Sequence, residues 1–276
     1  MDILISILSC KWLSYTFMQY ALLTVTLLSI IFGLLGSLII DKRMAFFADA
    51  YGHSTFTGLA IGALLGISPT LSMLIFTIFF ALGINYIKSK NILSSDTIIG
   101  VFASFASALG LCLLSREGGF SKYSSFLVGD ILTIQPSNIL SILLCLIVVI
   151  AVWLSCFNKF LALSCNRSIA QSKGIKYYFY ENIFTVLVAC VVVLSIKIVG
   201  ILLISALIIL PAASSKNIAR NIREAHLFSV LIALLSGLIG LILSFYLKTA
   251  SGPSIALTSS LLFFLSLCAR KNNKNT

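Results

Sequence analysis

The sequence predicts an all-α fold, a polytopic transmembrane helical bundle with about eight or nine membrane segments, some of them short or broken. Hydrophobic residues make up 59% of the 276-residue chain and charged residues only 10%, whereas a soluble domain carries about 25% charged residues. The mean hydropathy is +1.10. Apolar residues form continuous runs of about 15 to 25 residues instead of alternating, which excludes an outer-membrane barrel.

Polar breaks between the apolar runs set the expected spans, and residues 1–276 are expected to form a single transmembrane domain. Residues 1–16 are expected as an interfacial helix or a short partial span. The clear spans are expected at residues 17–40, 44–67, 71–87, 98–114, 139–157, 227–247 and 254–268. Each is long enough to cross the hydrocarbon core or to nearly cross it.

The run from residue 183 to residue 210 is apolar except for Lys197. One helix of this length would measure about 42 Å, too long for one span and too short for two. We therefore expect two short or broken helices that turn near Lys197 and Gly200, with Pro211 ending the second. Lys197 fits either a loop lysine that snorkels at the outer face or a functional charge.

The basic residues divide unevenly between the two sides of the membrane when the loops alternate. One side receives fourteen: Lys42, Arg43, Lys88, Lys90, Lys159, Arg167, Lys173, Lys176, Lys216, Arg220, Arg223, Arg270, Lys271 and Lys274. The other receives five: Lys11, Arg116, Lys122, Lys197 and Lys248. Because cytoplasmic loops carry the excess of Lys and Arg, the N-terminus is expected outside and the C-terminus in the cytoplasm. This rule also explains the net charge of +11, so no nucleic-acid partner is expected.

Asp49 and His53 stand out within an apolar stretch, in the sequence "RMAFFADAYGHSTFTGLAIGALLG". Residues four apart share one face of a helix, so a carboxylate and an imidazole, both ligands of divalent transition metals, would meet there. An acid at membrane depth is costly, which favours a functional site, although a structural pair that caps the helix start explains the spacing equally well. Gly58, Gly62 and Gly66 form a stripe that would let another helix approach closely.

Two functions fit a membrane protein with such a pair, and a third lacks the residues that it needs. The chain has no G-x-x-x-x-G-K-[ST] motif for ATP, so an ATP-driven importer would need a separate ATPase subunit. The alternative is an ion- or proton-coupled secondary transporter that uses Asp49 and His53 as a protonatable pair. An intramembrane metalloenzyme would need a set of three ligands such as H-E-x-x-H, which the sequence lacks.

Three stretches in order along the chain resemble the permease subunits of bacterial ABC importers for zinc, manganese or iron. They are "RMAFFADAYGHSTFTGLAIG", "FLVGDILTI" and "IVGILLISALIILPAASSKNIAR". The family pattern has R-R-M before D-x-x-x-H, and later V-G-x-L-L before P-A-A. The resemblance covers nearly the whole chain, and the three stretches together are specific.

The resemblance implies that the chain is a multi-pass permease of the bacterial cytoplasmic membrane and not itself an enzyme. It implies that Asp49 and His53 contact the metal ion in transit, with no stably bound cofactor. It also implies that residues 158–181 form a cytoplasmic coupling segment, in which Ala170, Gly174 and Ile175 contact the ATPase. The expected partners are a cytoplasmic ABC ATPase that uses the ATP, an extracytoplasmic metal-binding protein, a second permease copy or a related permease, and membrane lipid.

The chain departs from the family pattern next to the pair, where Ala48 stands in place of Gly and "GHS" in place of S-H-A. The start of the coupling segment, "SCNRSIAQ", lacks the usual acids. Two imidazoles and two carboxylates from two copies could surround Mn, Fe or Zn, so the ligand types do not select the metal. Asp130, within the second stretch, could attract cations to an outer vestibule or cap a helix.

Overall fold

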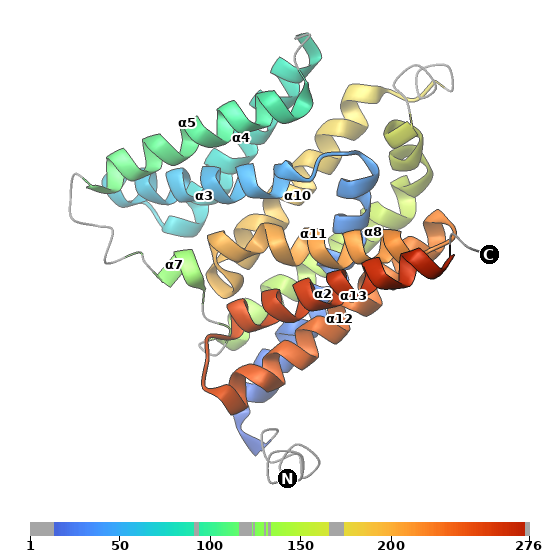
Figure 1. Cartoon of the computed structure of the whole chain (residues 1–276). Helices are drawn as coiled ribbons and strands as arrows, with labels where there is room; N and C mark the ends of the chain where they lie inside the picture. Colours follow the sequence, from blue (N-terminus) through green and yellow to red (C-terminus); the bar gives the residue numbers. More distant parts are fainter. Residues whose placement is uncertain are drawn as a thin grey trace.

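The computed structural model describes residues 14–90, 94–115, 123, 125–129, 131, 134–165 and 174–273, and all regular structure within them is helical. The helices are α2 (Thr16–Asp41), α3 (Phe46–Leu65), α4 (Pro69–Lys90), α5 (Ser95–Ser115), α7 (Ser125–Val128), α8 (Pro136–Cys165), α10 (Tyr177–Val199), α11 (Ile201–Ile218), α12 (Ile222–Leu247) and α13 (Ser251–Asn273). Figure 1 shows their arrangement. The all-α bundle predicted from the sequence is confirmed.

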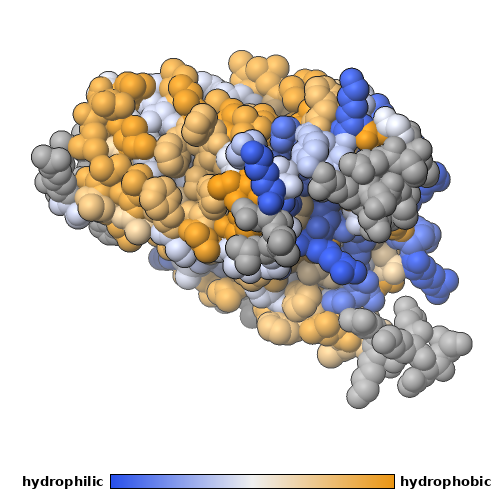
Figure 2. All heavy atoms as spheres, turned by 90° about the horizontal axis from the view of Figure 1, so that it is seen from above, coloured by the Kyte–Doolittle hydropathy of each residue, from blue (hydrophilic) through white to orange (hydrophobic). Residues whose placement is uncertain are grey.

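The long helices run alternately between two ends of the molecule. At one end the last residue of α2, Asp41, pairs with Lys216 near the end of α11. At the same end the Asn217 amide donates to the Ser266 hydroxyl near the end of α13 at 2.9 Å. Tyr15, before α2, lies instead beside Phe245 near the end of α12, with ring centroids 6.1 Å apart. We call the end that contains Asp41, Lys216 and Asn217 the basic end. Figure 2 shows hydrophilic residues gathered toward one end of the molecule, with apolar residues covering much of the remaining face.

Helix α3 is the inner member of the bundle. Eight other helices of the described chain, α2, α4, α5, α8, α10, α11, α12 and α13, are long and apolar enough to span a membrane. Helix α3 packs against α4, α5, α10 and α11, and thirteen of its twenty residues are buried. Such enclosure shields the polar residues among these thirteen from lipid. Eight apolar spans and this ninth helix agree with the predicted number of segments.

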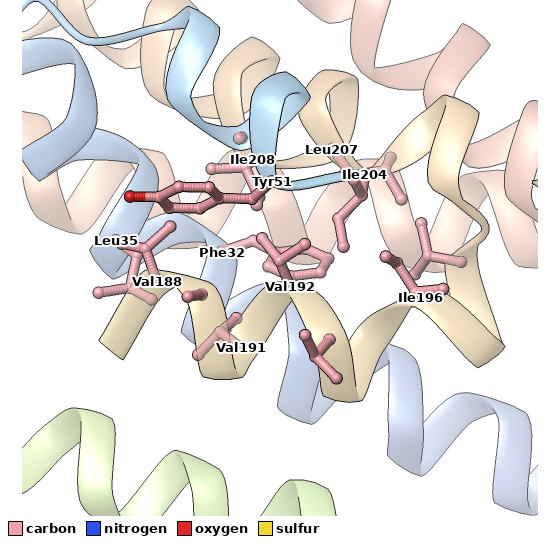
Figure 3. Close-up of a cluster of buried hydrophobic side chains, with 14 of the residues drawn as sticks. Phe32, Leu35, Tyr51, Val188, Val191, Val192, Ile196, Ile204, Leu207 and Ile208 are labelled. Carbon is pink, nitrogen blue, oxygen red and sulfur yellow. The ribbon is translucent and has the colours of Figure 1, made fainter. Parts of the chain in front are cut away.

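Aliphatic and aromatic side chains from four helices form the core around α3. Figure 3 shows it with the following residues labelled: Phe32 and Leu35 of α2, Tyr51 of α3, Val188, Val191, Val192 and Ile196 of α10, and Ile204, Leu207 and Ile208 of α11. All of them are buried. In a membrane the association of helices depends on close van der Waals packing, so this interlocked cluster fixes α3 against α10 and α11.

Two of the three glycines in the predicted stripe permit close packing. A Cβ at Gly58 would lie 2.8 Å from the Cα of Met73 on α4, and one at Gly62 would lie 2.7 Å from the Cβ of Ser72. The expectation was wrong for Gly66, which has nothing within 4 Å of such a Cβ. Gly66 follows the end of α3 with φ of 67°, a left-handed conformation that favours glycine at a helix C-terminus.

The break predicted near Lys197 and Gly200 is confirmed at Gly200, which separates α10 from α11. The expected end at Pro211 was wrong, because α11 continues through it to Ile218. Proline inside a helix leaves one carbonyl without its usual donor, and packing within a helical bundle tolerates this. The packing of α11 against α2, α12 and α13 is such an environment.

Several helices extend beyond the predicted spans into the stretches that looked like polar loops. Helix α8 continues to Cys165 and α10 begins at Tyr177, so both ends of the 158–181 segment are helical. Helix α12 begins at Ile222 because the Asn221 side chain accepts from the Glu224 backbone N–H at 2.8 Å. The carboxylate of Glu224 in turn accepts from the Arg220 backbone N–H at 3.0 Å. Polar residues here stabilise helix ends where the hydropathy pattern placed loops.

Candidate functional site

Helix α3 brings Asp49 and His53 together on one face, as the spacing predicted. The Nε2 atom of His53 lies 3.6 Å from Oδ2 of Asp49. The side chain of His53 is 35% exposed and that of Asp49 is 48% exposed. Both ligand groups are therefore accessible from outside the chain, although the helix that carries them is largely buried.

Ser205 of α11 belongs to the same site, and sequence reasoning missed it. Its hydroxyl lies near the Asp49 carboxylate, and toward an ionised carboxylate a hydroxyl can only act as a donor. Helix α11 packs against α3 beside Gly52, where an added Cβ would lie 3.4 Å from the backbone carbonyl oxygen of Ile201. Ser205 lies inside an apolar run where a single serine gives no signal of its own.

Hydroxyl groups fix α3 to its neighbours α4 and α5. Thr55 and Thr77 of α4 share a hydrogen bond of 3.1 Å between their hydroxyls. The Thr57 hydroxyl donates to the backbone carbonyl of Ala106 on α5. The Ser72 hydroxyl of α4 donates to the Gly58 carbonyl at 2.6 Å. These contacts hold α3 in a defined rotation, which fixes the direction in which Asp49 and His53 point.

The pair offers one carboxylate and one imidazole, whereas a typical zinc site has four ligands from protein or water. Within the described residues no group of three or more His, Cys, Asp or Glu side chains comes together. A metal ion bound at Asp49 and His53 would therefore need further ligands from water or from another chain.

Gly174 and Ile175, two of the three residues expected to contact the ATPase, lie at the basic end just before α10. Ala170 falls outside the described residues, as does Asp130 of the second family-like stretch. Gly174 has φ of 70°, a left-handed conformation that favours glycine, and an added Cβ there would have nothing within 4 Å. Ile175 is half-buried and packs against the core, and α10 begins two residues later.

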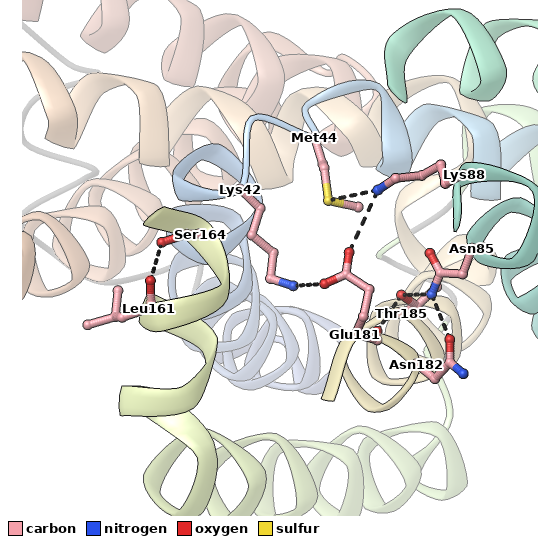
Figure 4. Close-up of polar contacts among 9 residues, drawn as sticks. All are labelled: Lys42, Met44, Asn85, Lys88, Leu161, Ser164, Glu181, Asn182 and Thr185. Atoms are coloured by element: carbon pink, nitrogen blue, oxygen red, sulfur yellow. Dashed lines mark hydrogen bonds and ion pairs between the residues drawn. The ribbon is translucent and has the colours of Figure 1, made fainter. Parts of the chain in front are cut away.

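Glu181 falls at the end of the predicted coupling segment, residues 158–181. The structure places it in the second turn of α10, where it is 5% exposed. Its carboxylate pairs with Lys42 and lies 3.7 Å from the ammonium of Lys88 (Figure 4). Burial lowers the pKa of Lys42 from its usual value, and the Glu181 carboxylate opposes part of this shift. No local pattern indicates this cluster, because its members are far apart along the chain.

The model of the ABC 3 transport family matches residues 14–270, almost the whole chain. The chain belongs to the ABC 3 transport family. The match includes α3 with Asp49 and His53, and it confirms the resemblance found in the sequence. Because eight of its helices can span a membrane, this family member is a multi-pass protein of the bacterial inner membrane.

Named relatives in the ABC 3 transport family align with the chain nearly from end to end. The "High-affinity zinc uptake system membrane protein ZnuB" of Haemophilus influenzae is 31% identical over 252 residues, which cover 91% of this chain and 97% of that protein. The "Manganese import system permease protein ScaB" of Streptococcus parasanguinis is 32% identical over 262 residues, covering 95% and 94%. These matches support an ABC transport component and give no support to a secondary transporter.

Solved structures agree with this assignment. The chain is similar to one in "PsaBC from Streptococcus pneumoniae in complex with Fab", with a TM-score of 0.82, 27% identity, and coverage of 96% of this chain and 94% of that one. An inward-facing metal-chelate type ABC transporter is similar in fold, with a TM-score of 0.72 at 18% identity. The helical arrangement of this family member is thus one already seen in ABC transporters.

Proposed function

We propose that the chain is the membrane-spanning permease subunit of an ABC importer that carries a divalent transition metal ion into the cytoplasm. The observation that carries this proposal is the Asp49 and His53 pair, which lies on the inner helix of an ABC 3 family member and is accessible from outside the chain. The relatives are named for zinc and manganese, and both ions accept carboxylate and imidazole ligands. Iron remains a third candidate on ligand chemistry alone.

The other components of the importer follow from what this chain lacks. The sequence has no ATP-binding P-loop motif, so a cytoplasmic ABC ATPase supplies the energy. An extracytoplasmic metal-binding protein delivers the ion. A second permease, either a copy of this chain or a related one, faces the first, and two Asp-His pairs across a two-fold axis supply four ligands to one ion.

The orientation follows from the charge at the two ends. Lys42, Lys88 and Lys216 meet at the basic end, as shown by their ion pairs with Glu181 and Asp41. Cytoplasmic loops carry the excess of basic residues, so the basic end faces the cytoplasm. Helix α3 then starts on the cytoplasmic side, and His53, about 11 Å along it from Phe46, lies near the middle of the membrane.

The side chains act on the ion by replacing its hydration shell. Asp49 supplies the negative charge that offsets the cost of moving a divalent cation into a low-dielectric region. His53 adds a neutral nitrogen ligand through a ring atom that is free of a proton. The site binds the ion only briefly, because alternating access exposes it first to the outside and then to the cytoplasm.

The proposal is tested by measuring cellular Mn, Zn and Fe in a metal-depleted strain that expresses the ATPase and the metal-binding protein with or without this chain. We expect one of these metals to accumulate only when all three components and an intact ATPase are present. Accumulation that persists with a catalytically inactive ATPase would contradict an ABC importer and favour a secondary transporter.

Ser205→Ala tests the hydroxyl that contacts Asp49. Without this donor the carboxylate loses part of its orientation, and outer partners of metal ligands typically contribute about 10- to 100-fold to affinity or activity. We expect the metal concentration for half-maximal uptake to rise by about 10-fold. Ser244→Ala is the matched control, since that buried hydroxyl bonds within its own helix to Leu241 at 2.8 Å. Equal uptake curves for Ser205→Ala and wild type would remove Ser205 from the site.

A further inference from the structure

Glu181 joins three helix ends at the basic end. One of its oxygens bonds to Lys42, which directly follows α2, and the other lies 3.7 Å from Lys88 near the end of α4. The side chains of Lys42, Glu181 and Lys88 are only 3%, 7% and 14% exposed. Figure 4 shows the two lysines on opposite sides of the carboxylate. We call Lys42, Lys88 and Glu181 the ion cluster.

The start of α3 is held by this ion cluster. The Lys88 ammonium lies 3.7 Å from the sulfur of Met44 and 5.3 Å from the centroid of the Phe47 ring. Phe47 in turn contacts Tyr51 edge to face, with ring centroids 5.0 Å apart. Asp49 lies between these two aromatic residues along the helix. The first turn and a half of α3 is thus attached to the cluster directly or through one neighbour.

The start of α10 is held by the same set of contacts. Next to Glu181, the side-chain amide of Asn85 on α4 donates to Thr185 at 2.8 Å and to Asn182 at 3.0 Å. These bonds add a neutral polar layer beside the ion cluster. Gly174 and Ile175, which are expected to contact the ATPase, precede this part of α10 by only a few residues.

We propose that the ion cluster around Glu181 is a rigid link that passes movement of the segment before α10 to the start of α3, and so to Asp49 and His53. The inference rests on the proposed function as an ATP-driven permease. It makes Glu181, Lys42 and Lys88 positioning residues, because none of them touches the transported ion.

Burial makes this link rigid. Separating a carboxylate from its lysines inside the protein leaves charges without partners in a low-dielectric region, which is strongly unfavourable. The cluster therefore stays intact while the helices around it shift. Covalent continuity adds to the effect, because only three residues separate Lys42 from the first residue of α3.

The other ion pair at the basic end provides a comparison. Asp41 pairs with Lys216 and joins the end of α2 to the end of α11. This pair is similar in chemistry and lies one residue from Lys42, but it includes neither α10 nor the residues that contact Phe47. Breaking it removes a comparable contact without separating α10 from α3.

The test uses the complete complex of this chain, its ATPase and its metal-binding protein in proteoliposomes, with Mn²⁺ and Zn²⁺ as the metals. The measured quantity is metal taken up per ATP hydrolysed. In Glu181→Gln we expect this ratio to fall by about 10-fold, within the range typical of coupling between sites, while ATP hydrolysis per folded complex stays near the wild-type rate. Lys88→Met keeps the ion pair between Lys42 and Glu181 but removes the contact of Lys88 with Phe47. It should lower the metal taken up per ATP by less than Glu181→Gln does.

Asp41→Asn is the matched control. We expect it to lower the melting temperature of the complex without changing metal uptake per ATP. Wild-type metal uptake per ATP in both Glu181→Gln and Lys88→Met would overturn the rigid link. So would a fall in this ratio in Asp41→Asn as large as that in Glu181→Gln. If Glu181→Gln does not fold, Lys88→Met alone decides in the same way. A wild-type complex that hydrolyses ATP but moves no metal would instead contradict the proposed function.

Discussion

Asp49→Ala and His53→Ala are each expected to reduce metal uptake by about 100-fold or more, at unchanged amounts of permease in the membrane. Loss of an outer partner of a metal ligand already costs about 10- to 100-fold, so loss of the ligand itself should reach the upper end of that range. Both side chains are partly exposed, so neither substitution opens a cavity in the core. The measurement is initial uptake of ⁵⁴Mn or ⁶⁵Zn by cells that express the whole importer.

The chain offers a control of each residue type. Asp96 is exposed in the first turn of α5, and Asp96→Ala should transport like wild type. His226 is buried near the start of α12, and its Nδ1 atom bonds to the Ile222 carbonyl at 2.9 Å. His226→Gln should therefore affect the amount of folded protein and not uptake per permease. Wild-type uptake by both Asp49→Ala and His53→Ala would show that the pair is structural.

Gly200→Ala is expected to lower the free energy of unfolding by about 3 kcal/mol, close to the largest effect of a single strained residue. Gly200 has φ of 89° and ψ of 153°, a conformation that is essentially limited to glycine. A Cβ at this position would also lie 2.3 Å from the carbonyl carbon of Val128, which is rigid backbone. The break between α10 and α11 therefore depends on Gly200, and its contact with α7 depends on Gly200 and on Gly129, where a Cβ would lie 2.3 Å from the carbonyl carbon of Val199.

Gly100→Ala is the opposite case. Gly100 lies within α5 and has nothing within 4 Å of an added Cβ. Alanine should therefore raise stability by up to about 1 kcal/mol, since it favours the helix and restricts the unfolded chain. Thermal unfolding in detergent, followed for both variants beside wild type, measures the difference. Equal melting temperatures for Gly200→Ala and wild type would contradict the role given to the break.

Hydropathy predicted the spans because each membrane helix is encoded by its own apolar run. The observed helix α2, Thr16–Asp41, differs by one residue at each end from the predicted span of residues 17–40. The turn at Gly200 was also predicted, since an apolar run of that length cannot cross the membrane once as a straight helix. These features depend on local sequence and on the thickness of the bilayer.

The missed features depend on contacts between distant residues. Glu181 looked like a loop acid, and its burial becomes favourable only when Lys42 and Lys88 arrive from two other helices. Pro211 looked like a helix end, and packing against other helices keeps α11 continuous. No local pattern reports such partners.

The candidate site could be predicted in part for the same reason. Asp49 and His53 lie one turn apart on a single helix, so their proximity follows from the helical period. Ser205 comes from α11 and reaches Asp49 only because α11 packs against α3 beside Gly52. Position within one element can be deduced from sequence, whereas contact between elements requires the fold.

The most direct test of a metal pathway through α3 is to locate the ion itself. The measurement is anomalous X-ray scattering at the zinc edge from crystals of the complete importer loaded with Zn²⁺. We expect a peak about 2.0–2.2 Å from a carboxylate oxygen of Asp49 and from a ring nitrogen of His53, the usual ligand distances for zinc. Zinc bound within the membrane region at other residues, with Asp49 and His53 unligated, would contradict the central claim.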